Sequence, residues 1–313
     1  QLIDNNKLYD TPEVCNLIWG TLNSYISDKK RIFFSADGCF NRIGIEYLLY
    51  NDKPLSEQFE VYRLSSTKEI CHKRKQEKLT KATLFGNINY NEEGYTPTIS
   101  QNTKGQKRGA ADDEAQFADL GNTRREVNEI YNILKGKGID TVEPFTDTKA
   151  SKTTFMSQSD TDVNILHIAT HGMYDNKRKS TDAGSMEHSF LAFAGANIDD
   201  DALVTAADIA TMNLRKCSLA VLSACETGLG KLGDDGVFGL QRGFKNAGVQ
   251  TLLMSLKNVY DDSTADLMIS FYKHLMTGAT KREALVKAQK EIRSNGYNDP
   301  KHWAAFILLD GLD

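Results

Sequence analysis

The sequence contains no apolar run of the roughly 18 residues that a membrane-spanning helix needs. Its N-terminus lacks the basic and apolar segments of a secretory signal, and Gln1 stands where an initiator methionine would be. We therefore expect a cytoplasmic protein with no membrane partner, and a chain that is a fragment or a processed form.

Cysteine and net charge are also scarce. The chain has 5 cysteines among 313 residues, an odd number with no paired spacing, which excludes a disulfide framework and suits a reducing compartment. A net charge of −4 gives no electrostatic reason to expect a nucleic-acid partner. No repeat of 20 to 50 residues is visible, so a solenoid is excluded as well.

Strand-like and helical patterns alternate in the second part of the chain. Apolar residues three and four positions apart predict a helix over 124–135, and further helices are predicted over about 235–246 and after Asp262 or Ser263. Buried strands are predicted at 163–170, 219–224, 251–256 and 304–309. This alternation predicts an α/β fold with a parallel-dominated sheet flanked by helices.

The first third of the sequence predicts a smaller α/β unit, and a polar stretch follows it. Residues 91–119 are rich in Asn, Gly, Thr, Gln, Asp and Lys and have few large apolar side chains. Such a segment cannot bury enough apolar surface to offset its ordering entropy. We interpret it as a mobile linker or surface insertion.

Two strand ends carry the candidate chemistry. His171 follows one apolar strand and Cys225 follows another, and a glycine comes soon after each. Parallel strands that end side by side would bring an imidazole next to a thiol, the arrangement that generates a sulfur nucleophile. The spacing matches the signature of caspase-type proteases, whose His lies about 50 residues before the Cys. We therefore predict that His171 and Cys225 form a catalytic dyad.

The remaining parts of an acyl-transfer site are predicted near the same loops. The backbone N–H groups of Gly172 and Cys225 are the candidate oxyanion donors. Glu226, Asp234 and Asp235 are candidates for an acidic substrate pocket that would select Arg or Lys, although both aspartates could instead cap the next helix. A preference for Asp would need basic pocket residues, for which Arg242 and Lys231 are the weaker candidates.

Three other interpretations compete with the protease hypothesis. Cys225 could be an ordinary buried cysteine. The glycine run 228–233 matches a dinucleotide-binding fingerprint but lacks its ribose-binding acidic residue, so no cofactor is expected. His167 and His171 lie on one face of a strand, but neither zincin nor paired-cysteine spacing accompanies them, so no metal is expected. We expect His167 to be a packed or hydrogen-bonded neighbour of the active site.

Taken together, the motifs resemble the CHAT-domain family, caspase-like peptidases that are often associated with tetratricopeptide repeats. The resemblance extends over nearly the whole chain and rests above all on 120–127, 165–174, 222–230, 239–244, 258–262 and 302–306. It implies a caspase–separase fold in which residues 1–90 form a pseudo-protease half, 91–119 a linker and 120–313 the catalytic domain. It also assigns the catalytic roles to His171 and Cys225. Tyr260 departs from the family pattern, which usually has an apolar residue there.

The resemblance also implies a function. It suggests a bacterial defence or signalling protease that is activated by a regulatory sensor or a tetratricopeptide-repeat partner. Such an enzyme would cut a specific protein substrate, for example a gasdermin-like pore former. The alternative is a catalytically silent caspase-fold scaffold for protein–protein interaction. Because proteases cut exposed, unstructured backbone, we also predict that the active enzyme nicks itself between about Asn102 and Asp113.

Overall fold

The computed structural model describes residues 7–72, 78–91, 108, 116–175, 184–225, 230–233 and 236–312. Its central sheet contains nine strands in the order β1-β4-β16-β15-β12-β8-β5-β6, with β7 also paired to β5. In that order the strands are Arg31–Ser35, Glu60–Leu64, Phe306–Leu309, Thr251–Ser255, Leu219–Ser223, Ile165–Ala169, Lys81–Ile88 and Asp140–Thr141, and β7 is Phe145–Asp147. All pairings are parallel except that of β15 with β16, so the predicted parallel-dominated sheet is confirmed.

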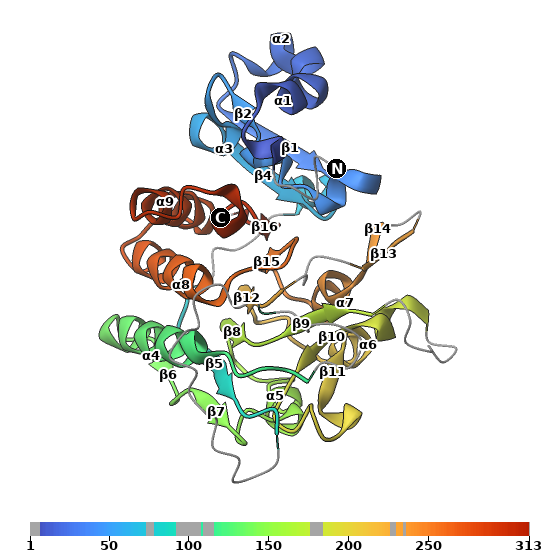
Figure 1. Ribbon diagram of the computed structural model, residues 1–313, viewed down its shortest axis with the longest axis vertical. Helices are drawn as coiled ribbons and strands as arrows, with labels where there is room; N and C mark the ends of the chain where they lie inside the picture. Colours follow the sequence, from blue (N-terminus) through green and yellow to red (C-terminus); the bar gives the residue numbers. More distant parts are fainter. Residues whose placement is uncertain are drawn as a thin grey trace.

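Helices lie on both sides of this sheet (Figure 1). On one side α4, α8 and α9 pack against one another in a row, and on the other side lie α5, α6 and α7. The α-helices are α1 Pro12–Trp19, α2 Asn23–Ile26, α3 Leu55–Gln58, α4 Gly121–Gly136, α5 Lys152–Met156, α6 Ala206–Ala210, α7 Leu240–Asn246, α8 Asp261–Leu275 and α9 Lys281–Ser294. No described helix is long and apolar enough to cross a membrane.

Smaller elements complete the described chain. A three-stranded sheet joins β9 Gly172–Tyr174, β10 Ser189–Ala192 and β11 Leu203–Thr205, and two hairpins pair β2 Leu49–Tyr50 with β3 Lys53–Pro54 and β13 Gly230–Gly233 with β14 Gly236–Gly239. The 3₁₀ helices are η1 Lys7–Tyr9, η2 Gly20–Leu22, η3 Gly38–Arg42, η4 Ile45–Tyr47, η5 Thr67–Cys71, η6 Gly184–His188, η7 Asp200–Ala202 and η8 Pro300–His302.

The central strands are buried along their whole length. Every residue of β8, β12, β15 and β16 is buried, which explains why these strands are continuous apolar runs in the sequence rather than alternating ones. Helices cover both faces of these strands, so neither face meets water.

The N-terminal part of the chain shares this sheet. Its strands β1 and β4 extend the sheet beyond β16, whereas β5 lies between β8 and β6. Tyr47 in η4 donates a hydrogen bond of 2.5 Å to the carbonyl of Phe306 in β16. The division into 1–90, 91–119 and 120–313 remains a prediction. Strand β5 belongs to the first of these parts and pairs with strands of the last, so the two larger parts share one sheet.

Two predicted helix starts are wrong. The helix predicted from Asp235 begins only at Leu240, because the glycine-bounded segment Gly236–Gly239 pairs with β13 as a hairpin strand. Helix α8 has Tyr260 as its N-cap, without a side-chain cap bond, rather than Asp262 or Ser263. The side chain of Asp261, its first residue, points to Arg108 instead.

A glycine in β5 sets the distance between the sheet and α4. A Cβ atom at Gly86 would lie 2.6 Å from Cγ1 of Val127 and 3.2 Å from the carbonyl oxygen of Thr123. Only glycine therefore lets α4 approach this closely. The approach fixes the position of Glu126, which precedes Val127 on the buried side of the helix.

Candidate active site

The register of two neighbouring strands places His171 and Cys225 at one edge of the sheet. Strands β8 and β12 are paired in parallel, with Ala169 opposite Ser223 at their ends. His171 and Cys225 each follow two residues after these partners. The predicted convergence of the two strand ends is therefore confirmed, at the edge where open α/β sheets bind ligands.

Cys225 lies in a buried, hydrogen-bonded environment. The backbone N–H of Val259 points to its Sγ atom at 3.1 Å, and Sγ lies 3.6 Å from the carbonyl oxygen of the same residue. An N–H donor directed at sulfur stabilises a thiolate. The backbone N–H of Cys225 itself donates to the carbonyl oxygen of Arg108 at 3.4 Å.

His171 is almost fully buried, between two aromatic rings. The ring centroids of Tyr90 and Phe117 lie 5.1 and 5.5 Å from that of the imidazole, and Nε2 is 2.6 Å from the carbonyl oxygen of Ala118. Burial lowers the pKa of His171 to about 4, although hydrogen bonding to the backbone of Ala118 and Arg108 opposes the shift. The imidazole is consequently neutral at pH 7, the form that can accept a proton.

Arg108 fills a buried acidic pocket beside Cys225. Its Nε donates to Oδ1 of Asp261 at 2.8 Å, and its Nη2 donates to Oε2 of Glu126 at 2.7 Å and to the carbonyl of Asp261 at 3.2 Å. Its Nη1 donates to both the carbonyl and the hydroxyl of Ser223, at 2.9 and 2.6 Å. All five N–H donors of the guanidinium therefore have an acceptor.

Both carboxylates of the pocket have further partners. Oε1 of Glu126 lies 3.0 Å from Nε2 of His167, and Oδ2 of Asp261 accepts from the backbone and side-chain amides of Asn122, each at 2.9 Å. Burial alone would raise the pKa of Glu126, but the charge of Arg108 together with His167 lowers it to about 2. The same two carboxylates hold the pKa of Arg108 above its usual value despite burial. Glu126 and Arg108 are thus both charged at pH 7.

The structure tests the sequence-predicted site residues unevenly. His171, Cys225 and Gly172 lie at the same strand ends, with Gly172 opening β9, whereas Glu226, Asp234 and Asp235 lie outside the described residues. His167 is a buried neighbour, as expected, and contacts both Glu126 and the hydroxyl of Tyr272. The buried Arg108 departs from the expectation of a surface linker; the rest of 92–115 lies outside the described residues.

The sequence does not indicate Glu126 or Asp261 as site residues, and it indicates Arg108 only as part of the segment 102–113 that is predicted to be nicked. Glu126 interrupts the apolar side of a helix just before Val127, and Asp261 begins another helix. A carboxylate at a position that helical periodicity assigns to the core is the one signal that could have indicated Glu126. Asp261 resembles an ordinary first-turn acidic residue, so no local signal marked it.

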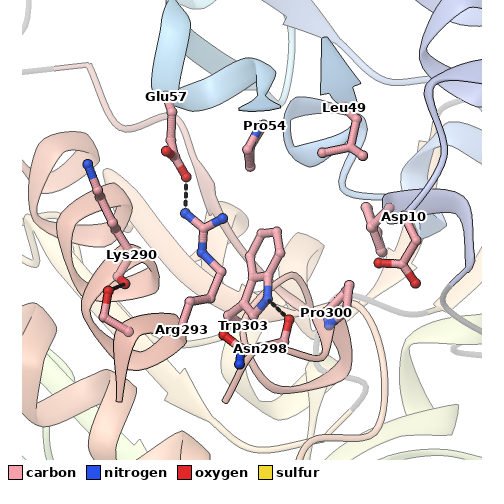
Figure 2. A pocket seen from close by; sticks show the side chains of 11 residues that line it. Asp10, Leu49, Pro54, Glu57, Lys290, Arg293, Asn298, Pro300 and Trp303 are labelled. Atoms are coloured by element: carbon pink, nitrogen blue, oxygen red, sulfur yellow. Dashed lines mark hydrogen bonds and ion pairs between the residues drawn. The ribbon is translucent and has the colours of Figure 1, made fainter. Parts of the chain in front are cut away.

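Other candidate sites are weaker. Among the described residues no group of three or more His, Cys, Asp or Glu side chains could hold a metal ion. Residues 230–233 of the glycine run form β13 of a hairpin, not the strand-to-helix turn of a dinucleotide site. A hollow of about 530 Å³ (Figure 2) lies among α9, η8 and the N-terminal part of the chain, with Arg293 paired to Glu57 at its wall. Its lining contains neither His171 nor Cys225.

Comparison with known proteins agrees with this architecture. A family model described as the CHAT domain matches residues 13–311. Tetratricopeptide repeat protein 28 of Homo sapiens is 27% identical over 193 residues, which are 53% of this chain and 8% of that protein, and its Mus musculus counterpart matches to the same extent. The chain therefore spans only a small part of these relatives.

Solved structures show the same fold. The crystal structure of the Arg-specific cysteine proteinase gingipain R aligns with 96% of this chain, and the aligned part is 67% of the gingipain chain. The TM-score is 0.58 and the sequence identity is 10%. The complex of the pro- and mature domains of Porphyromonas gingivalis RgpB gives a TM-score of 0.56, also at 10% identity. The alignment covers 96% of this chain and 68% of the RgpB chain. At such low identity the likeness shows the fold alone.

Proposed function

The chain belongs to the CHAT-domain family and has a caspase-like cysteine-protease fold, and on this basis we propose that it is a cysteine endopeptidase with a His171–Cys225 dyad. One observation carries the proposal. The parallel register of β8 and β12 brings both residues to one sheet edge, where a backbone carbonyl already accepts from the N–H of Cys225.

The proposed reaction needs only groups of this site and a water molecule. Neutral His171 takes the proton of Cys225, and the thiolate attacks the carbonyl carbon of the substrate peptide bond. The backbone N–H groups of Cys225 and Gly172 hold the oxyanion. His171 then gives the proton to the leaving amine, and water hydrolyses the thioester.

We further propose that the substrate is a protein and that another protein controls access to the site. The matched relatives are named for tetratricopeptide repeats, which supports a repeat-bearing regulatory partner. A role in defence or signalling, including the cutting of a gasdermin-like pore former, follows from the family resemblance and belongs to the same proposal.

The test is a digestion of denatured protein extracts by wild type, Cys225→Ala and His171→Ala, with new N-termini mapped by mass spectrometry. The proposal predicts cuts that only wild type makes. If no cut depends on Cys225, the scaffold alternative is correct.

A further inference from the structure

Arg108 is held in the way an enzyme holds the side chain of a substrate. Its guanidinium is fully buried, and each of its five N–H donors meets an acceptor on one of three residues, Asp261, Glu126 and Ser223. A lysine ammonium has three donors from a single atom and could not satisfy this planar fork of acceptors. The pocket is therefore built for arginine rather than for positive charge in general.

The backbone of Arg108 is also bound as a substrate backbone would be. Its N–H donates to the carbonyl of Val259 at 3.1 Å, and its carbonyl oxygen accepts from the N–H of Cys225 at 3.4 Å. Main-chain hydrogen bonds of this kind give extended peptides their affinity, while a side-chain pocket gives specificity. The carbonyl group presented to the nucleophile is the one that Arg108 shares in a peptide bond with Gly109.

We propose that Glu126, Asp261 and Ser223 form the pocket for the arginine side chain before the cut bond, and that Arg108 occupies it as the chain's own first substrate. The inference rests on the proposed protease function and adds its specificity and an internal cut site. The carbonyl oxygen of Arg108 accepts from the backbone N–H of Cys225, and the pairing of β8 with β12 brings His171 to the same sheet edge.

The self-cleavage step balances without any co-reactant except water. The Sγ atom of Cys225 bonds to the carbonyl carbon of Arg108, and the C–N bond to Gly109 breaks as His171 protonates the departing amine. Water then cleaves the thioester, leaving a carboxylate on Arg108 and regenerating the thiol. The pieces stay associated, because β5 of the N-terminal piece lies between β8 and β6 of the other.

Two measurements test the pocket and the internal cut separately. The first is intact-protein mass spectrometry after incubation of wild type, Cys225→Ala, Arg108→Ala and the matched control Lys107→Ala. We expect fragments ending at Arg108 and starting at Gly109 in wild type and in Lys107→Ala only. A cut at any other bond, or no Cys225-dependent fragment, overturns the internal cut site.

The second measurement is kcat/KM for fluorogenic peptides that carry arginine, lysine or citrulline before the cut bond, with Arg108→Ala as the enzyme because its pocket is vacated. We expect arginine to exceed uncharged citrulline by at least about 100-fold. Glu126→Gln and Asp261→Asn should each lower the arginine value roughly 100-fold. The matched controls Glu129→Gln and Asp262→Asn, on the same helices, should leave kcat/KM for the arginine peptide unchanged.

The outcomes separate this inference from the proposed function. Cuts that depend on Cys225 but show no preference for arginine overturn the pocket while the protease function stands. If neither wild type nor Arg108→Ala makes any Cys225-dependent cut, in itself or in peptides, the protease function fails and this inference fails with it.

Discussion

Replacing Arg108 by alanine removes the guanidinium that two buried carboxylates share. The change is best made in a Cys225→Ala background, so that no cut complicates the comparison. Removing one partner of a buried ion pair costs about 3–5 kcal/mol, because the other charge stays buried. Here Glu126 keeps His167 at 3.0 Å and Asp261 keeps the two Asn122 amides. We therefore expect the lower end, a loss of about 3 kcal/mol in the free energy of unfolding.

Urea unfolding followed by the fluorescence of the two tryptophans, Trp19 and Trp303, measures this loss. The matched control is Arg125→Ala, which breaks a partly exposed pair of 2.8 Å with Asp266 and should cost less than about 1 kcal/mol. A loss for Arg108→Ala as small as that of the control would refute the claim that Arg108 neutralises the pocket.

The same comparison has a pH dependence of known sign. In the parent, the pKa of Glu126 is lowered to about 2, so its stabilising contribution is present above about pH 4.5 and is lost as the pH falls toward 2. Without Arg108, burial should instead raise that pKa above 4.5. Protonation of Glu126 then removes the unpaired buried charge in the variant at a higher pH than in the parent. The difference in the free energy of unfolding between the two proteins should therefore shrink as the pH falls from 7 to 4.

Three further predictions concern the surroundings of the site. Because burial lowers the pKa of His171 to about 4, its contribution to the free energy of unfolding should fall by about 3 kcal/mol from pH 7 to 4, a fall that His171→Gln should lack in pH-dependent unfolding. Gly86→Ala should lower the free energy of unfolding by about 1–3 kcal/mol through its clash with Val127, whereas Gly136→Ala, with open space around its Cβ, should not. Burial raises the pKa of Cys217 to about 12, so iodoacetamide at pH 8 should leave Cys217 unlabelled in the native protein, and rapid native labelling would contradict its burial.

The strand ends were predictable because they depend on local pattern. Continuous apolar runs indicated β8, β12, β15 and β16, and the parallel arrangement followed from the helices between strands. Two residues that follow adjacent parallel strands at equal spacing lie at the same edge of the sheet. Hence the sequence alone predicts that His171 and Cys225 lie at one sheet edge, and the register of β8 and β12 agrees with this.

The acidic pocket was not predictable because it exists only in tertiary structure. Arg108 belongs to a polar stretch that composition assigns to solvent, and its burial depends on carboxylates from α4 and α8. Asp261 begins α8, and an acidic residue at the start of a helix is ordinarily explained by its favourable interaction with the helix dipole. The sequence predicts an acidic pocket from Glu226, Asp234 and Asp235, which are near Cys225 along the chain, whereas Glu126 and Asp261 come from distant segments.

The central claim is that His171 and Cys225 act as one catalytic unit. Its most direct test is kcat/KM for a peptide substrate with wild type, Cys225→Ala, His171→Ala and the double variant. Because the two residues would act in the same step, each single variant should lose nearly all activity and the double variant should lose no more. Cys225→Ala at the wild-type rate would contradict the account, and full activity in His171→Ala would point to His167 as the base.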